Sequence, residues 1–230
     1  NIWLRVDTSR SANSTQIYQG NDELIFLSYP VQNKFNIYSL DYKTGRTNEK
    51  SGWVFKQPSS ETRDFEPTSL GYNELNHNCY VSGYLYNSGN PSQGLFISQL
   101  DEQKKAKKNL LINEISTQQF LWTQDNVFVS SDGSVYVMGI VADKKIITKK
   151  NIAVAKLDQN LKLEWAYRYY AEKFNYYRST LNFDKEGNPL LSYSTNGYFP
   201  MIFAKLNKQG EVIWEKGYPH NSPQMKVLSD

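Results

Sequence analysis

The sequence contains one cysteine and two histidines, and each scarcity excludes a class of protein. Cys79 has no second cysteine to pair with, so a fold held by intrachain disulfides is excluded. His77 and His220 lie far apart in polar contexts, and two isolated histidines do not form a zinc site without further ligands at short spacing. We therefore expect neither a bound metal ion nor a cofactor.

Long apolar runs and a strong charge of one sign are also missing. Mean hydropathy is −0.63, and no apolar run approaches the roughly 18 residues of a membrane-spanning helix. The net charge is only +3, and no recognised nucleic-acid-binding motif accompanies it. No nucleophile elbow is present either. We expect no direct membrane span, no nucleic-acid partner and no catalytic residue that a motif identifies.

Aromatic residues, in contrast, are abundant and follow a repeat of about 55 residues. The chain has 17 Tyr, 11 Phe and 5 Trp, residue types that β-strands favour. Strand-like segments preceded by turn signals align at positions 24, 79, 135 and 189, which are 55, 56 and 54 residues apart. Small residues follow in three of the four copies, at Ser28, Gly83 and Gly139.

A second set of repeating positions confirms the period. Each unit continues into a β-rich run that ends in Leu followed by Asp or Asn: Leu40-Asp41, Leu100-Asp101, Leu157-Asp158 and Leu206-Asn207. Because Asp41, Asp101 and Asp158 recur at one repeat position, we interpret them as turn residues rather than as a catalytic carboxylate set. Cys79 shares the strand position of Leu24 and Val135, which predicts a buried thiol.

Each unit therefore predicts four antiparallel strands, A to D, which is one blade of a β-propeller. The predicted fold is all-β, a single propeller domain or segment over residues 1–230. The repeats span approximately 14–56, 68–113, 126–170 and 179–219, with half-blade strands at 1–7 and 223–230. We favour a segment of a larger propeller; the alternative is that the two end strands pair and close a ring.

Residues 204–214, Ala-Lys-Leu-Asn-Lys-Gln-Gly-Glu-Val-Ile-Trp, resemble the repeats of pyrroloquinoline-quinone-like propellers and related secreted bacterial propellers. Residues 155–165 and 40–45 are similar to the same motif. The resemblance implies that the Asp and Gly form the C–D turn, that the Trp packs between blades, and that the protein lies outside the cytoplasm. It implies no catalytic residue, because the quinone dehydrogenases of that family use a vicinal cysteine pair that a lone Cys79 cannot supply.

The candidate binding surface is the face that carries the D–A and B–C connections. Tyr and Arg are enriched at interfaces because they bury area and still satisfy polar partners, and loops on a rigid scaffold often carry function. The alternative is that alternate rings pack between blades. The predicted binding residues are Tyr84, Tyr86, Arg63, Asp64, Tyr169, Tyr170, Phe174, Tyr176, Tyr177 and Arg178.

Two functions are consistent with this surface. The first is a non-catalytic protein-binding or scaffolding module in an extracytoplasmic or cell-envelope assembly, whose partner is another protein in a larger complex. The second is a carbohydrate-binding or glycoside-hydrolysing propeller, in which a glycan is the partner and Asp64 or Glu66 lies beneath the aromatic face. Acidic residues that converge at the axial mouth would favour an enzyme, and a broad aromatic patch would favour an interface.

Overall fold

The computed structural model describes residues 17–19, 23–31, 34–41, 43–44, 47–53, 64–87, 90–101, 105–112, 114–115, 118–121, 127–143, 150–170, 174–195 and 201–218. Within them every regular element is a β-strand, which confirms the all-β prediction. This part of the chain includes no helix of the length and hydropathy needed to cross a membrane.

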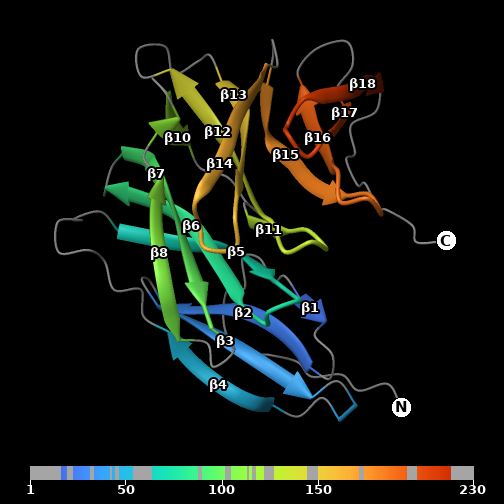
Figure 1. Cartoon of the computed structure of the whole chain (residues 1–230). Helices are drawn as coiled ribbons and strands as arrows, with labels where there is room; N and C mark the ends of the chain where they lie inside the picture. The colour runs from blue at the N-terminus through green and yellow to red at the C-terminus, as the bar shows by residue number, and fades with distance from the viewer. Residues whose placement is uncertain are drawn as a thin grey trace.

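The strands form four antiparallel sheets in chain order (Figure 1). The first sheet contains β1 (Ile17–Gln19), β2 (Glu23–Val31), β3 (Lys34–Asp41) and β4 (Thr47–Trp53). The second sheet contains β5 (Asp64–Tyr72), β6 (Cys79–Asn87), β7 (Asn90–Leu100) and β8 (Ala106–Ile112). The fourth sheet contains β15 (Phe174–Phe183), β16 (Pro189–Thr195), β17 (Met201–Leu206) and β18 (Val212–Tyr218).

The third sheet departs from the predicted four strands because its A strand is in two pieces. It contains β9 (Glu114–Ile115), β10 (Gln118–Leu121), β11 (Val127–Val129), β12 (Val135–Asp143), β13 (Lys150–Leu157) and β14 (Leu163–Tyr170). β11 pairs with the beginning of β12, and β10 pairs with its end. Three sheets therefore have four strands and one has six.

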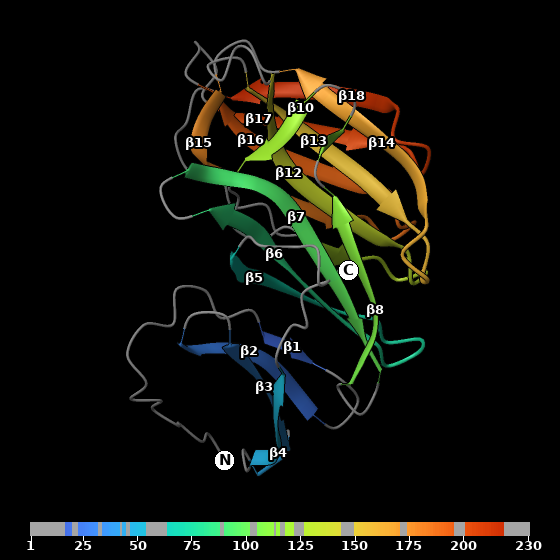
Figure 2. The ribbon, with the colours of Figure 1, turned by 90° about the vertical axis from the view of Figure 1, so that its left-hand side faces the viewer.

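The sheets follow one another around a curved array (Figures 1 and 2). β2 contacts β5, so the first sheet lies beside the second, and β7 and β5 contact β10 and β11, so the second lies beside the third. The third and fourth sheets share a hydrophobic cluster. No strand pairing among the described residues joins the first sheet to the fourth, so the described strands do not form a closed propeller. The predicted half-blade strands at 1–7 and 223–230 lie outside the described residues.

The third sheet is buried on both faces, which explains why β12 is an almost continuous apolar run. Side chains alternate along a strand. Tyr136 and Met138 therefore pack with Leu191 and Leu206 of the fourth sheet. Val135, Val137 and Val141 on the opposite face pack with Tyr80 and Ile97 of the second sheet. Such stacking is what a four-stranded unit requires, since it cannot cover both of its faces alone.

The A–B and C–D turns lie at one end of the sheets, and their geometry follows from local turn chemistry. The Asp158 carboxylate accepts main-chain N–H groups of Asn160 and Lys162, both at 2.8 Å. Asp101 accepts the N–H of Lys105, and Asp41 accepts that of Thr44. The prediction that these three acids are turn residues is confirmed. Cys79 is fully buried, as its strand position predicted.

Candidate functional site

The B–C and D–A connections leave the sheets at the end opposite the A–B and C–D turns, and we call this the connection end. β5 runs from Asp64 toward its A–B turn, and β6 runs back from that turn to Asn87. Their register places Asp64 opposite Tyr86 and Glu66 opposite Tyr84. The backbones of these four residues therefore lie together at the connection end of the second sheet.

The third and fourth sheets bring further predicted residues to the connection end. Tyr170 is the last residue of β14 and pairs with Asn151, and Phe174 is the first residue of β15 and pairs with Thr195. The β15–β16 register shifts between Phe174 and Ser179. Tyr176, Tyr177 and Arg178 fall within this irregular stretch. A register shift re-aims side chains and is common next to binding sites.

Several of the predicted contacts lie outside the described residues. Arg63 is outside them altogether. The side chains of seven further predicted residues are also outside the described part of the chain: Asp64, Tyr86, Tyr170, Phe174, Tyr176, Tyr177 and Arg178. For these seven the structure gives strand position and register, and their role as binding residues stays a prediction.

Tyr169 occupies a different place from the one its sequence context suggested. Its side chain is only 9% exposed and packs in the cluster between the third and fourth sheets. Its hydroxyl donates to the main-chain oxygen of Gly210 at 2.6 Å. Burial raises the pKa of this phenol, so it remains a neutral donor. Tyr169 therefore holds two sheets together, and its ring is not presented to a ligand.

Tyr84, the other predicted binding residue whose side chain the structure describes, is half-buried.

Asp64 and Glu66 lie two residues apart on β5. Residues two apart in a strand lie on the same face, about 6.7 Å apart along the chain. Glycoside hydrolysis uses two carboxyl groups separated by about 5–5.5 Å or about 6.5–9.5 Å. The structure gives the strand positions of these two acids. No other two acids share one face of a described strand at the connection end of the second sheet.

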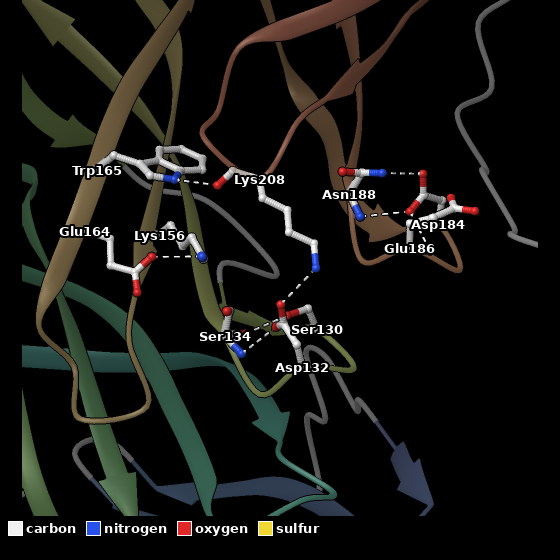
Figure 3. Close-up of polar contacts among 10 residues, drawn as sticks. All are labelled: Ser130, Asp132, Ser134, Lys156, Glu164, Trp165, Asp184, Glu186, Asn188 and Lys208. Atoms are coloured by element: carbon white, nitrogen blue, oxygen red, sulfur yellow. Dashed lines mark hydrogen bonds and ion pairs between the residues drawn. The ribbon is translucent and has the colours of Figure 1, made fainter.

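The turn end is also rich in polar groups, but these stabilise turns. The Asp132 carboxylate accepts the hydroxyl of Ser130, the N–H of Ser134 at 3.0 Å and the ammonium of Lys208 at 3.3 Å (Figure 3). Partial burial opposes ionisation of Asp132, but these hydrogen bonds outweigh it and hold the pKa well below its usual range. A carboxylate so firmly ionised is a poor general acid.

Asp184 behaves in the same way in the fourth sheet. Its carboxylate forms an ion pair with Lys205 at 2.7 Å and accepts the Asn188 main-chain N–H at 2.8 Å. Burial again opposes ionisation, and the bonds from Lys205 and Asn188 lower the pKa of Asp184 overall. No group of three or more His, Cys, Asp or Glu side chains that could hold a metal ion occurs among the described residues. Asp132 and Asp184 are thus both engaged in contacts that stabilise turns.

Comparison with known proteins adds evidence about the fold. No protein-family model matches the chain. No curated protein matches it in sequence. Among solved structures, a Hadza microbial sialidase has a TM-score of 0.63 and 11% identity over 89% of this chain and 45% of its own. The endo-arabinase of Bacteroides thetaiotaomicron VPI-5482 has a TM-score of 0.56 and 15% identity, covering 90% of this chain and 79% of its own.

A GH43 β-1,3-galactosidase has a TM-score of 0.55 and 12% identity, covering 83% of this chain and 42% of its own. The chain thus spans less than half the length of the sialidase and the galactosidase. Identities this low show the fold alone. These neighbours are propeller-type enzymes, so the propeller interpretation is supported, whereas a specific likeness to quinone-type repeats is not shown.

The same comparison contradicts the prediction of a non-catalytic scaffolding module. Similar structures include an α-L-arabinofuranosidase from Clostridium thermocellum and an exo-β-1,3-galactanase from Phanerochaete chrysosporium, each with a TM-score of 0.53. They are mostly glycoside hydrolases. The sequence-based preference for scaffolding depended on the absence of recognisable catalytic motifs, and such an absence does not exclude a site formed by residues that are distant in sequence.

Proposed function

We propose that the chain is part of a carbohydrate-active β-propeller whose connection end binds a glycan. The observation that carries this proposal is the register of β5 and β6, in which Asp64 and Glu66 lie opposite Tyr86 and Tyr84. Carboxylates and aromatic rings are the two groups that glycan chemistry needs, and this register places both on adjacent strands. The likeness in fold to glycoside hydrolases supports the same class.

The chemistry divides between the two kinds of side chain. Tyr86 and the aromatic residues around Phe174 offer ring faces for sugar rings to stack on. Of the two acids on β5, one in its protonated form donates to the leaving oxygen, and the other, ionised, acts on the anomeric carbon or on a water molecule. The reaction class is therefore glycoside hydrolysis. An extracytoplasmic location belongs to the same proposal and is tested by fractionating cells that make the native protein.

The test uses the full chain with a glycan array and a panel of polysaccharides. We expect Glu66→Gln and Asp64→Asn each to lower hydrolysis by about 10²-fold or more, the usual size of an acid–base contribution. Glu186→Gln, an exposed turn acid at the other end of the sheets, is the matched control and should retain full activity.

Binding is measured separately from cleavage. Tyr86→Ala should weaken glycan binding, whereas Tyr167→Ala, which removes an exposed ring from the middle of β14, should not. A glycan that is bound but not cleaved, with Tyr86 required, would make the protein a lectin. If the array gives no hit and no polysaccharide is cleaved, the proposal is rejected.

A further inference from the structure

One buried polar side chain near the connection end has no hydrogen-bond partner among the described residues. Asn151 is the second residue of β13 and is only 8% exposed, and no hydrogen bond joins its side-chain amide to another residue there. Other buried amides differ, since that of Asn73 donates to the Gly133 oxygen at 3.2 Å and that of Gln99 donates to the Gln159 oxygen at 2.8 Å. Because buried polar groups are almost always hydrogen-bonded, the Asn151 amide is a place for a ligand or a water molecule.

The Asn151 side chain faces the second sheet. Asn151 pairs with Val141 on β12 and with Tyr170 on β14. Val141, and Ala153 two residues further along β13, belong to the apolar cluster between the second and third sheets. Residues that pair directly share a face of the sheet, as do residues two apart in one strand. The Asn151 amide therefore lies at the connection end of this cluster.

The second sheet brings the candidate glycan-binding strands to the same junction. Leu95 on β7 pairs with Ile112 on one side and with Tyr84 on the other, and Tyr84 pairs with Glu66. This row crosses the second sheet near the connection end, and its members Leu95 and Ile112 belong to the same apolar cluster as Val141. β10, which pairs with the end of β12, contacts β7. Asn151 and the β5–β6 register thus lie at one end of one junction.

The repeat assigns no packing role to this position. Asn151 lies six residues before the Leu of the Leu-Asp motif, where the other units have Lys34, Gly94 and Pro200. A position that every sheet needs for packing keeps an apolar residue in each unit, as the Leu of that motif does. The buried amide is therefore a feature of the third sheet and not of the repeat.

The position of Asn151 also makes it reachable. Two further buried polar atoms, the hydroxyl oxygens of Tyr136 and Ser192, have no partner among the described residues. Both residues are 0% exposed, so a ligand would have to separate packed strands to reach them. Asn151 keeps some exposure and lies where its strand begins at the connection end, so its amide borders the surface that the proposed glycan occupies.

We propose that the Asn151 amide binds two neighbouring hydroxyl groups of one sugar unit at the connection end of the second and third sheets. This assignment rests on the proposed glycan-binding function and adds a residue that the sequence analysis did not identify. A side-chain amide presents N–H donors and a carbonyl acceptor side by side, and each sugar hydroxyl both donates and accepts. Two adjacent hydroxyls therefore satisfy both ends of the amide at once, which a sugar carbon without a hydroxyl does not do.

The test variant is Asn151→Leu, because leucine has a similar volume and lacks both polar groups. Since the amide has no partner among the described residues, the free energy of unfolding in urea should be unchanged or higher. The ligand is the oligosaccharide that gives the strongest signal with the unmodified chain on the glycan array. Its affinity, measured by titration calorimetry, should fall roughly 5- to 100-fold, the loss of two hydrogen bonds.

Asn160→Ala is the matched control. It removes an exposed amide from the C–D turn of the same sheet, at the end away from the proposed glycan, and should bind as the unmodified chain does. Deoxy analogues of the oligosaccharide make the measurement specific. An analogue that lacks a contacted hydroxyl should bind the unmodified chain more weakly than its parent, whereas Asn151→Leu should not distinguish the two, because both changes remove the same bond.

The outcomes separate this assignment from the proposed function. If the unmodified chain binds no glycan, the proposed function is rejected and the assignment with it. If the unmodified chain binds and a stable Asn151→Leu variant binds equally well, the assignment alone is overturned, and the amide holds a water molecule instead. A loss of stability in Asn151→Leu also overturns the assignment, because it reveals a hydrogen-bond partner within the protein.

Discussion

Trp165 in the third sheet donates its indole N–H to the main-chain oxygen of Lys208 in the fourth, at 2.9 Å. Forty-three residues of sequence separate the two. Their contact joins β14 to the turn between β17 and β18, so it orients one sheet relative to its neighbour. Together with the hydrophobic cluster between the two sheets, this contact holds the fourth sheet against the third.

Trp165→Phe should therefore destabilise the fold through one lost hydrogen bond. Most of the ring remains, but the Lys208 oxygen loses its donor, and we expect a loss of about 1–2 kcal/mol. For a chain of this size that corresponds to a fall of about 2–8 °C in Tm, measured by calorimetry. Trp214→Phe at the equivalent exposed position should change stability by less than about 0.5 kcal/mol. Equal effects of the two variants would contradict this account.

Gly210 and Gly187 provide a matched pair for the packing of that turn. Both adopt positive φ, +85° and +79°. A Cβ at Gly210 would lie 2.6 Å from Tyr167 and 2.9 Å from Trp165, whereas at Gly187 the nearest atom is 3.5 Å away. Gly187→Ala should cost only the backbone strain of about 1–2 kcal/mol, and Gly210→Ala should cost at least about 1 kcal/mol more. Urea unfolding measures the free energy of unfolding of both variants. Equal losses would show that the β14 side chains move away from a Cβ at position 210 without cost.

Tyr80 and Tyr136 occupy the same repeat position, but their hydroxyls differ. The Tyr80 hydroxyl donates to the Gln159 oxygen at 3.2 Å. The buried Tyr136 hydroxyl has no partner among the described residues, and burial, followed by the charges of Asp132 and Glu164, raises its pKa. Tyr80→Phe should destabilise by about 1 kcal/mol, and Tyr136→Phe should be neutral or stabilising by a similar amount. A loss of stability in Tyr136→Phe would reveal a partner for that hydroxyl.

The sequence predicted the sheets and their turns well because both depend on local chemistry. Asp158 and its counterparts select the C–D turn through their own main-chain neighbours, and Gly210 supplies the positive φ. The division of the third A strand into β10 and β11 was not predicted, since only β11 near Val127 carries the expected pattern.

The candidate site was less accessible to sequence reasoning. Side chains alternate along β14, so those of Tyr169 and Tyr170 lie on opposite faces of the third sheet. The sequence does not show which of these faces the fourth sheet covers. Tyr169 was therefore wrongly assigned to the binding face. The alternative that alternate rings pack between blades describes this residue correctly. The pairing of Asp64 with Tyr86 depends on strand register, which becomes known only when both strands are placed.

The Asp132 carboxylate accepts hydrogen bonds from Ser130 and Ser134 and forms an ion pair with Lys208 at 3.3 Å, and these contacts predict a loss of stability in acid. Because the pKa of Asp132 is lowered in the folded protein, the unfolded chain binds the proton more readily. The stabilisation is therefore fully present above the unfolded pKa of about 3.9 and is lost as the pH falls below it. Asp132→Asn should reduce stability at pH 7 by no more than about 1 kcal/mol, because the pair is partly exposed. The difference from the unmodified protein should shrink as the pH is lowered from 5 toward 2.

Lys208→Met is the reciprocal variant, since it removes the charge of the partner and leaves the main-chain oxygen that Trp165 uses. Combining Lys208→Met with Asp132→Asn should cost less than the sum of the two single changes, because both remove the same interaction. Chemical denaturation at several pH values measures both effects. If the two changes add fully at pH 7, the side chains of Asp132 and Lys208 do not interact, and the acid sensitivity of Asp132 then comes from the hydrogen bonds that it accepts from Ser130 and Ser134.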